Sequence, residues 1–316
     1  MVLRPEVLIV GSRNDFSCDY VVAHLASQHT SYLRLNSEDL PFHDLCLDPL
    51  RRELRCRIKN ESFVIGEDTL RSIWFRRPVF LRDYGPAIPA GAADQINRAQ
   101  WAAFIRGLMI FAQAKWINHP RATYLAEQKP VQLSIAQEIG FLVPTTLITN
   151  HSMEVARFGG QAVAIKGVDT VLAYEDDQEI FAFTNIVTSG QVATAELKHC
   201  PIMIQQQITP KIDIRVTAVD NNLFAASITK DGQSISGDWR LHKSGLSYNS
   251  CSLPTRVEEL CRALTKRLGL VFGGIDLALR GDDYFFLEIN PTGEWAWLVD
   301  SAGLRIDEAI AHALIS

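Results

Sequence analysis

The 316-residue sequence lacks several features that would point directly to a class of protein. It has no C-x-x-C pair, and its six cysteines are scattered, which argues against a disulfide framework or a zinc site and predicts reduced thiols in a cytoplasmic protein. No apolar run approaches the roughly 20 residues needed to cross a bilayer. The N-terminal apolar stretch is too short for a signal peptide. We therefore expect no membrane partner.

An excess of positive charge is also missing. The chain has 31 Lys and Arg residues against 36 Asp and Glu residues, a net charge of −5, which argues against nucleic acid as a partner. Local basic patches remain compatible with this value, because net charge says nothing about where the cations lie. The hydrophobic fraction of 47% excludes a disordered chain, and the length suggests two or three packed units.

Common catalytic signatures are absent as well. Gly11 stands alone after the first apolar run, so there is no Gly-rich phosphate-binding fingerprint. There is no G-x-S-x-G nucleophile elbow, and the histidines show no spacing typical of zinc. These absences argue against a serine hydrolase with a nucleophile elbow and against a zinc enzyme.

The hydrophobic pattern predicts an α/β fold with α+β lobes in three units: 1–118, 119–199 and 200–316. Pro120 predicts the turn that closes the first unit. The helices that the spacing predicts cover 19–28, 94–116, 127–139, 254–269 and 305–315. The predicted strands cover 6–10, 51–59, 62–66, 71–78, 141–150, 161–168, 180–187, 200–208, 213–220, 222–230, 273–280 and 284–290.

The two final strands carry the most informative polar residues. In YFFLEIN, alternation places Phe286, Glu288 and Asn290 on one face. If residues 281–283 form the loop, Arg280 pairs with Tyr284, and Asp276 then pairs with Glu288. Two carboxylates and an amide oxygen on one face predict a Mg²⁺ site, since Mg²⁺ prefers oxygen ligands. Exposed positions on a half-solvated sheet are the alternative for each acidic residue alone.

Four cations accompany these oxygen ligands. Lys129 opens a predicted helix, and Lys166 interrupts an apolar strand, where a lysine is costly to bury without an anion. Arg215 shares the polar face of a strand with Asp213, and Arg240 lies in a Gly/Ser-rich loop. For Lys166 alone, a strand-edge lysine that reaches into solvent is the alternative, and ion pairing at the surface could explain either arginine singly. Together with a metal site they indicate a nucleoside triphosphate pocket.

Two other conspicuous pairs are interpreted as structural. Arg76 and Arg77 precede Pro78 at a predicted strand end, where arginines are more often solvated or structural than substrate contacts. Trp295 and Trp297 are expected to cover the final hairpin as part of the core.

Several motifs together resemble a known family. DIRVTAV (213–219), GDWR (237–240), GGIDLAL (273–279) and FLEINPTGEW (286–295) resemble the ATP-grasp fold. They are most similar to its microviridin-type peptide ligases, the graspetide synthetases. The resemblance extends to WFRRP (74–78), WINHP (116–120), AEQKPVQLSIAQEIGFLVPTTLITN (126–150) and FTNIV (183–187), which covers nearly the whole chain and implies an N-terminal pre-ATP-grasp domain.

The resemblance implies a role for each matching residue. Mg²⁺, in two ions, would be held by Asp276, Glu288 and Asn290. The nucleotide phosphates would meet Lys129 and Lys166, and Arg215 and Arg240 would lie around the γ-phosphate and the acyl phosphate. Adenine would contact the hinge strand of Gln205, Gln206, Gln207 and Ile208, with Asp213 near the ribose. The chain departs from the family at Gln128, commonly Asn, and at Glu294, more usually Gln.

The resemblance also implies an ADP-forming ligase that uses ATP. The expected substrate is a precursor peptide with leader and core, whose Asp or Glu carboxylates would be joined to Thr, Ser or Lys side chains as lactones or lactams. One alternative is a ligase that adds a free amino acid to a protein or small acid, as ribosomal-protein glutamate ligases do. Another is an ATP-binding regulatory protein without turnover. A homodimer is a further expectation from the family.

Overall fold

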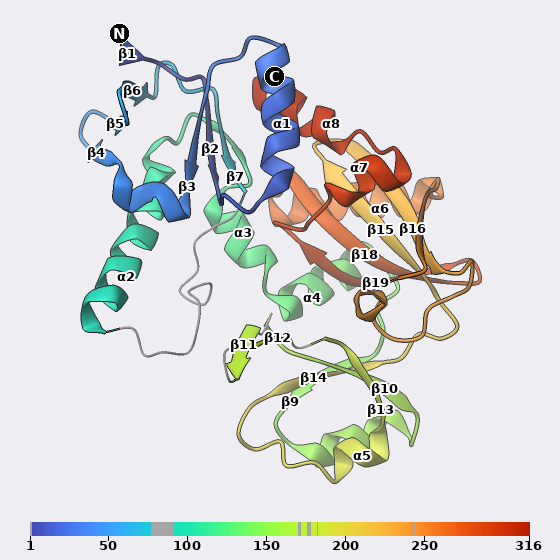
Figure 1. Ribbon diagram of the computed structural model, residues 1–316. Coiled ribbons are helices and arrows are strands. Elements are labelled where there is room, and N and C mark those ends of the chain that lie inside the picture. Colours follow the sequence, from blue (N-terminus) through green and yellow to red (C-terminus); the bar gives the residue numbers. More distant parts are fainter. Residues whose placement is uncertain (1, 77–90, 170–171, 176–177, 182, 243) are drawn as a thin grey trace.

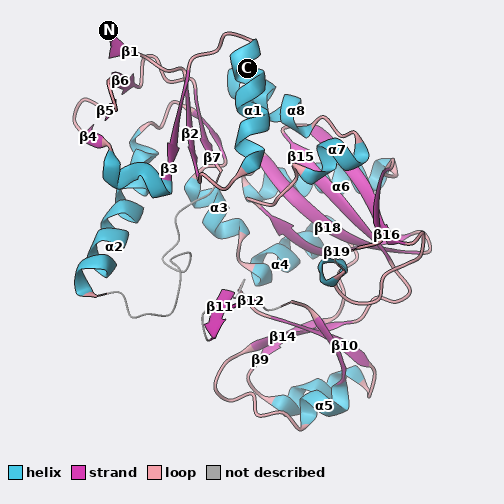
Figure 2. Ribbon diagram, viewed as in Figure 1, coloured by secondary structure: helices cyan, strands magenta, loops and turns pink. Residues whose placement is uncertain are grey.

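A computed structural model describes residues 2–76, 91–169, 172–175, 178–181, 183–242 and 244–316, and Figures 1 and 2 show how the elements are arranged. Helices and strands alternate along the chain, and the predicted α/β class is confirmed. Residues 77–90, which include Arg77 and Pro78, lie outside the described part.

The N-terminal unit contains two small sheets. One is parallel, with the order β3-β2-β7-β8, and the other has the order β1-β6-β5-β4. A buried run such as VLIVG in β2 is typical of a parallel strand covered on both faces. The elements of this unit are β1 (Val2–Leu3), β2 (Val7–Gly11), α1 (Phe16–Ser27), β3 (Tyr32–Asn36), β4 (Asp44–Asp48), β5 (Glu53–Ile58), β6 (Glu61–Gly66), β7 (Ser72–Phe75), α2 (Ala92–Gly107) and β8 (Lys115–Ile117).

The helix predicted over 94–116 is shorter than expected. It ends at Gly107, a short 3-10 turn follows, and Trp116 then lies in β8. Leu108 and Phe111 are buried, but they pack from the turn into the same core as β8. The apolar residues therefore continue without a break through a helix, a turn and a buried strand. Hydrophobic periodicity alone does not show where one of these elements ends and the next begins.

The central lobe holds a four-stranded sheet of order β13-β10-β14-β9, with α5 beside it at the bottom of Figure 1. Pro120, predicted as a turn, instead begins α3, because proline suits the first position of a helix. The strand predicted over 180–187 is two strands, and β14 extends the central sheet beyond residue 200. The elements are α3 (Pro120–Ala126), α4 (Lys129–Ile139), β9 (Thr146–Thr149), β10 (Ala162–Lys166), β11 (Leu172–Glu175), β12 (Gln178–Phe181), β13 (Asn185–Thr188), α5 (Ser189–Ala193) and β14 (Ile202–Gln206).

The C-terminal lobe is an antiparallel sheet of order β17-β16-β15-β18-β19. The hairpin predicted around residue 220 is confirmed, with Asp220 at φ 51° in the turn. Helix α6 ends at Gly269 in the left-handed conformation, as helices often do. The elements are β15 (Ile212–Val219), β16 (Asn222–Lys230), β17 (Leu246–Ser250), α6 (Thr255–Leu268), β18 (Phe272–Arg280), β19 (Asp283–Asn290), α7 (Trp297–Ala302) and α8 (Ile306–Ile315).

The final hairpin contains a β-bulge that the alternation did not predict. Asp276 does pair with Glu288, as expected, but Arg280 pairs with Asp283 and not with Tyr284. The register shifts between Asp276 and Leu277, and this shift compensates for the tighter loop. Phe286 consequently turns into the core, and its predicted place on the face of Glu288 is wrong.

A shared apolar core joins the N-terminal unit to the C-terminal lobe. Ile9 and Trp74 from the parallel sheet pack in one cluster with Val219 and Phe272 of the antiparallel sheet, together with residues of α1, α7 and α8. Trp295 is fully buried in this cluster, as predicted. In Figure 1, α1 and α8 lie side by side between the two sheets. None of the helices described is both long and apolar enough to cross a membrane.

Candidate active site

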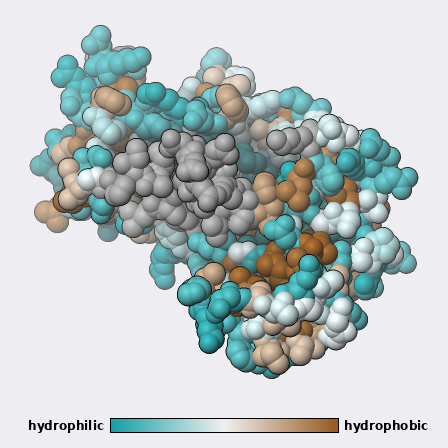
Figure 3. Space-filling view, turned by 60° about the horizontal axis from the view of Figure 1, so that its bottom comes forward, coloured by the Kyte–Doolittle hydropathy of each residue, from teal (hydrophilic) through white to brown (hydrophobic). Residues whose placement is uncertain are grey.

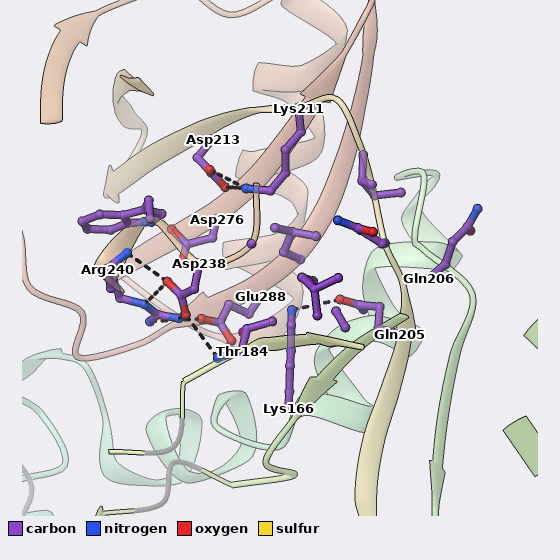
Figure 4. A pocket seen from close by; sticks show the side chains of 17 residues that line it. Lys166, Thr184, Gln205, Gln206, Lys211, Asp213, Asp238, Arg240, Asp276 and Glu288 are labelled. Carbon is purple, nitrogen blue, oxygen red and sulfur yellow. Dashed lines mark hydrogen bonds and ion pairs between the residues drawn. The ribbon is translucent and has the colours of Figure 1, made fainter. Parts of the chain in front are cut away.

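A pocket lies between the central lobe and the C-terminal sheet. Figure 3 shows hydrophobic residues together near the middle of the face beside the grey atoms, and Figure 4 shows the charged side chains that point into the pocket. One wall is contributed by β10, β14 and the chain after β14, and the other by β15, β18, β19 and the loop around Arg240. Its apolar lining includes Ala164, Ile186, Ile208, Trp239 and Leu287.

Most of the predicted site residues line this pocket. The structure brings together Lys166, Gln205, Gln206, Gln207, Ile208, Asp213, Arg240, Asp276 and Glu288. The remaining three, Lys129, Arg215 and Asn290, are adjacent to it and are described below. Residues more than a hundred positions apart thus share one pocket, because β10 and β14 face the hairpin that carries Asp276 and Glu288.

Asp276 and Glu288 form the acidic part of the pocket. They are directly opposite each other on β18 and β19, where side chains of an antiparallel pair lie close together. Burial by itself raises the pKa of Glu288, but Lys166, Arg240 and Lys129 outweigh it, so the pKa lies below its ordinary value. Glu288 is therefore ionised at neutral pH.

Lys166 reaches the pocket from β10 and is held by a buried amide. Its Nζ donates to Oε1 of Gln205 at 2.9 Å, and Nε2 of Gln205 donates to the hydroxyl of Thr146. Burial lowers the pKa of Lys166, and Glu288 opposes this effect. An anion such as a phosphate in the pocket would stabilise the ammonium form further, which is the behaviour expected of a phosphate-binding lysine.

Arg240 is anchored by the carboxylate of Asp238. Two hydrogen bonds of 2.9 Å join the guanidinium to both carboxylate oxygens, and Asp238 also accepts from the backbone N–H of Thr184 in the central lobe. A distance of 3.8 Å separates Nη1 of Arg240 from Oε1 of Glu288. This bidentate geometry aims the guanidinium at the acidic end of the pocket.

Arg215 lies behind Asp276, in a slot between two glycines. Its Nη1 donates to Asp276 at 2.9 Å, and its Nη2 donates to the carbonyl of Glu294 at 3.1 Å. A Cβ added at Gly274 or Gly293 would come within 2.2 or 2.4 Å of Nη2. Nε of Arg215 is buried without a hydrogen-bond partner. The guanidinium thus retains a donor beside the carboxylates.

Asp213 and Lys211 form a second charged pair on β15 and the residue before it. The ammonium of Lys211 donates to both oxygens of Asp213. Burial raises the pKa of Asp213 to about 6, although Lys211 opposes the shift. The pair lies at the end of the pocket away from Arg240 (Figure 4), where it can offer hydrogen bonds to a polar ligand.

Two predicted residues lie beside the pocket. Lys129, at the start of α4, donates to the carbonyl of Gly167 at 2.9 Å and is close enough to affect the pKa of Lys166. Asn290 shares the face of Glu288, and its Oδ1 accepts from the backbone N–H of Thr292 at 2.9 Å. Its side chain is exposed.

Some lining residues were missed as site residues. These are Thr184, Lys211, Asp238, Trp239 and Leu287. Lys211 stands two positions before Asp213, a spacing that was visible in the sequence and that places both side chains on one side of an extended chain. The bulge brings Leu287 to the pocket, and no local pattern signals that.

The oxygen ligands fit a divalent cation such as Mg²⁺. Within the described ranges, no place gathers three His, Cys, Asp or Glu side chains that could hold a metal by themselves. A cation held by Asp276, Glu288 and Asn290 would take its remaining ligands from water and phosphate oxygens, which is the usual arrangement for Mg²⁺. The surrounding cations suit the phosphates.

Residues 162–314, which carry most of this site, match the family described as the RimK-like ATP-grasp domain. The chain has the ATP-grasp fold. The predicted ATP-grasp fold is therefore confirmed, and enzymes with this fold are ligases that use ATP and Mg²⁺. No curated protein matches the sequence.

Solved structures resemble the ATP-grasp chain over its whole length. The macrocyclase MdnC from Microcystis aeruginosa MRC, bound with precursor peptide MdnA, is 24% identical with a TM-score of 0.82, covering 100% of this chain and 99% of that one. A RiPP-associated ATP-grasp ligase from Chryseobacterium gregarium, in complex with ADP and a leader and core peptide, has the same identity and TM-score, covering 98% and 96%.

A third structure is more distant. A RimK domain ATP-grasp protein from Sphaerobacter thermophilus is 13% identical, with a TM-score of 0.60, and covers 99% of this chain and 100% of its own. At these identities the structures establish the shared fold.

Proposed function

We propose that this ATP-grasp protein is an ADP-forming peptide ligase that joins carboxylates of a precursor peptide to hydroxyl or amine side chains of the same peptide. The observation that carries the proposal is the pocket in which Lys166, Arg240, Asp276 and Glu288 converge. The likeness over the N-terminal unit to two ligases solved with peptides supports a peptide substrate.

The nucleotide is assigned to the pocket by its chemistry. Lys166 and Lys129 would neutralise its phosphates, and the chain from Gln205 to Ile208, beside the apolar lining, would contact adenine. Asp213 would accept a hydrogen bond from ribose. Mg²⁺, in two ions, would be held by Asp276, Glu288 and Asn290 and would neutralise charge on the phosphates.

The reaction follows from this placement. A carboxylate oxygen of the peptide attacks the γ-phosphorus, the bond from that phosphorus to the bridging oxygen breaks, and ADP leaves. A hydroxyl or amine then attacks the acyl carbon, loses its proton and displaces phosphate, which forms an ester or amide. Arg215 and Arg240 would stabilise the charge on the transferred phosphoryl group. Most of the rate enhancement would come from positioning the two reacting groups.

A second candidate is a ligase that adds a free amino acid to a carboxylate. The match to the RimK-like ATP-grasp domain favours it, but that match covers residues 162–314 and leaves out the N-terminal unit. The TM-score is 0.82 against the peptide ligases and 0.60 against the RimK domain protein, which supports the first candidate.

The test is incubation of the protein with Mg²⁺, ATP and a short Thr-, Ser-, Asp- and Glu-rich peptide encoded beside its gene. We expect ADP release and a loss of one water from the peptide mass for each ring. Asp276→Ala and Glu288→Ala should abolish both, whereas Asp282→Ala, an exposed turn position, should not. An unchanged peptide mass with ADP release on addition of a free amino acid would favour the second candidate.

Two expectations about the whole protein remain predictions. All six cysteines, each within the described ranges, are free, which supports a cytoplasmic location. We also expect a homodimer, and light scattering after size-exclusion chromatography would distinguish it from a monomer.

A further inference from the structure

The backbone that follows Glu288 is held by side chains from outside its own hairpin. β19 is an edge strand, so the outer side of its backbone has no neighbouring strand in the antiparallel sheet. We call residues 289–294 the exit segment. Nevertheless, most of the backbone carbonyls in this segment accept a hydrogen bond from a distant side chain. The donors are Gln132 to Ile289, Asn118 to Pro291, Arg76 to Thr292 and Arg215 to Glu294.

Gln132 takes the place of a neighbouring strand at Ile289. Its Nε2 donates to the carbonyl of Ile289 at 2.8 Å, and its Oε1 accepts from the N–H of the same residue at 3.0 Å. The side chain is buried, and it comes from α4, the helix that begins at Lys129. The helix that presents a phosphate lysine is therefore joined to the strand between Glu288 and Asn290.

Asn118 holds the other side of Asn290. Its Nδ2 donates to the carbonyls of Pro291 at 2.9 Å and Phe272 at 2.8 Å, and its Oδ1 accepts from the N–H groups of Val271 and Phe272. The amide is buried, and its hydrogen-bonding capacity is fully used. Asn118 follows directly on β8, at the end of the N-terminal unit.

Arg76 holds the last part of the exit segment. It donates to the carbonyl of Thr292 and, at 2.9 Å, to the carboxylate of Glu294. Its Nε lies 3.2 Å from Asp15 and 3.1 Å from Ser17, and the side chain is 2% exposed. Arg76 is thus a buried, structural arginine that contacts both parts of the molecule, which agrees with the structural interpretation of its sequence position and not with the solvated one.

We propose that Gln132, Asn118 and Arg76 are positioning residues of the ligase site, which set where Glu288 and Asn290 present their oxygens. The inference rests on the proposed function, because it takes these two residues as metal ligands. It also gives the N-terminal unit a part in the site, since Asn118 and Arg76 belong to it.

The bulge in β19 explains why such support is needed. A strand slipped by one residue turns every side chain to the opposite face, and β19 already carries an irregular register beside Glu288. Hydrogen bonds at Ile289 and Pro291 hold the backbone on both sides of Asn290. Partners of this kind, which orient the ligands without touching the metal, typically govern metal affinity.

Gln132→Met tests the proposal, with Gln137→Met, an exposed glutamine on the same helix, as the matched control. The measurement is the calorimetric Kd of ADP with and without Mg²⁺, at a temperature where thermal melting shows each variant folded. We expect Gln132→Met to reduce the Mg²⁺-dependent gain in ADP affinity about tenfold or more, with metal-free ADP binding unchanged. An unchanged Mg²⁺-dependent gain, or an equal loss of both affinities, would overturn the positioning role.

Arg76→Lys is the second variant and covers the case in which Gln132→Met does not fold. Lysine keeps a positive charge for Asp15 but cannot hold Thr292 and Glu294 in the same planar geometry. We expect the same selective loss of the Mg²⁺-dependent gain, whereas Arg71→Lys, at a more exposed position before β7, should behave as the unmodified protein.

The two proposals fail in different ways. If the unmodified protein binds ADP no more tightly with Mg²⁺ than without it, the proposed function is wrong, and the inference is overturned with it. If the unmodified protein shows the gain and both variants keep it, only the inference is wrong.

Discussion

At the scale of single residues, the cations of the pocket are oriented before any ligand arrives. Gln205 holds Lys166, and Asp238 holds Arg240, each through hydrogen bonds of 2.9 Å. Both supporting side chains are buried, so neither exchanges its partner for water easily. Catalysis by charge stabilisation depends on such preorganisation, because no free energy is then needed to reorient the groups during the reaction.

We predict that Asp238→Asn lowers turnover while leaving ADP binding nearly intact. The amide keeps the volume but cannot accept two charge-assisted hydrogen bonds, so the guanidinium of Arg240 loses its orientation. Turnover should fall on the order of 10- to 100-fold, as expected for a misplacement of about 1 Å. Steady-state ADP release and calorimetric ADP binding measure the two effects.

The control for this variant is Asp282→Asn, in the exposed turn before β19. Turnover of Asp282→Asn should equal that of the unmodified protein. If Asp238→Asn lost ADP affinity and turnover to the same extent, a general loss of pocket structure would be the better explanation.

At this scale, the sequence predicted the side chains whose position follows from the face of a strand. It did not predict those whose position depends on partners far along the chain. Asp276 and Glu288 were placed together because antiparallel pairing is local to one hairpin. The burial of Arg76 was not predicted, since its partners include Thr292 and Glu294, far along the chain.

At the scale of elements, two strands and a turn create the slot for Arg215. Gly274 on β18 and Gly293 in the turn after β19 leave room for its guanidinium, and a Cβ at either position would meet Nη2. Side-chain atoms do not tolerate such short approaches, so the guanidinium would move before the sheet did. These glycines therefore serve close approach and not an unusual backbone angle.

We predict that Gly274→Ala lowers turnover about tenfold or more, because it displaces Arg215 from Asp276. The loss of stability should be modest, since the displaced group is the flexible end of a side chain. Gly91→Ala, where a Cβ has open space, is the matched control and should leave turnover unchanged. Full activity in Gly274→Ala would mean that Arg215 is not needed in its observed position.

Helices α1 and α8 are joined by a pH-sensitive contact. Asp307 on α8 is buried and accepts from His24 on α1 at 2.8 Å and from Arg305. Burial raises the pKa of Asp307, but these hydrogen bonds outweigh it, and the pKa lies below its ordinary value. The ionised carboxylate therefore stabilises the folded state.

We predict that Asp307→Asn weakens the dependence of stability on pH below about 4, the ordinary pKa of aspartate. A carboxylate with a depressed pKa stabilises the fold above its unfolded-state pKa, and this contribution is lost as the pH falls through the folded-state value. At pH 7 the variant should lose roughly 1–3 kcal/mol of unfolding free energy. Urea unfolding at a series of pH values measures both effects, and an unchanged acid limb would contradict the assignment.

At the scale of the whole molecule, the N-terminal unit and the C-terminal lobe share one apolar core. Their sheets meet in a common apolar cluster that includes α1, α7 and α8, and the exit segment is hydrogen-bonded from the same side. The central lobe has a separate core around Val163 and Ile204. The pocket lies where this lobe meets the C-terminal sheet. Ligand sites commonly form at such an interface between two structural units.

We predict that Ile310→Ala destabilises both sheets together. The side chain is fully buried in the shared cluster, so the cavity should cost roughly 2–5 kcal/mol. Tryptophan fluorescence and far-UV circular dichroism should report one coincident unfolding transition with a lowered midpoint. Leu50→Ala, at a position 94% exposed, should change the unfolding free energy by less than about 0.5 kcal/mol. Separate transitions in Ile310→Ala would mean that the two parts fold independently.

The sequence by itself determined the elements and residues whose signals are local. The hairpin of β15 and β16, the Gly269 end of α6, and the pairing of Asp276 with Glu288 all depend on neighbouring residues, so periodicity and turn chemistry predicted them. The motifs of the site likewise indicated the ATP-grasp fold, because each motif is a short run with a fixed spacing.

Only the tertiary structure decided what depends on distant contacts. One example is the bulge that turns Phe286 inward and Leu287 toward the pocket. It takes up the extra residue left by the tight loop, so that Asp276 still pairs with Glu288. The side chains that hold the exit segment come from four separate parts of the chain. Such contacts form only when long loops have closed, and no local pattern encodes which buried polar group will meet which.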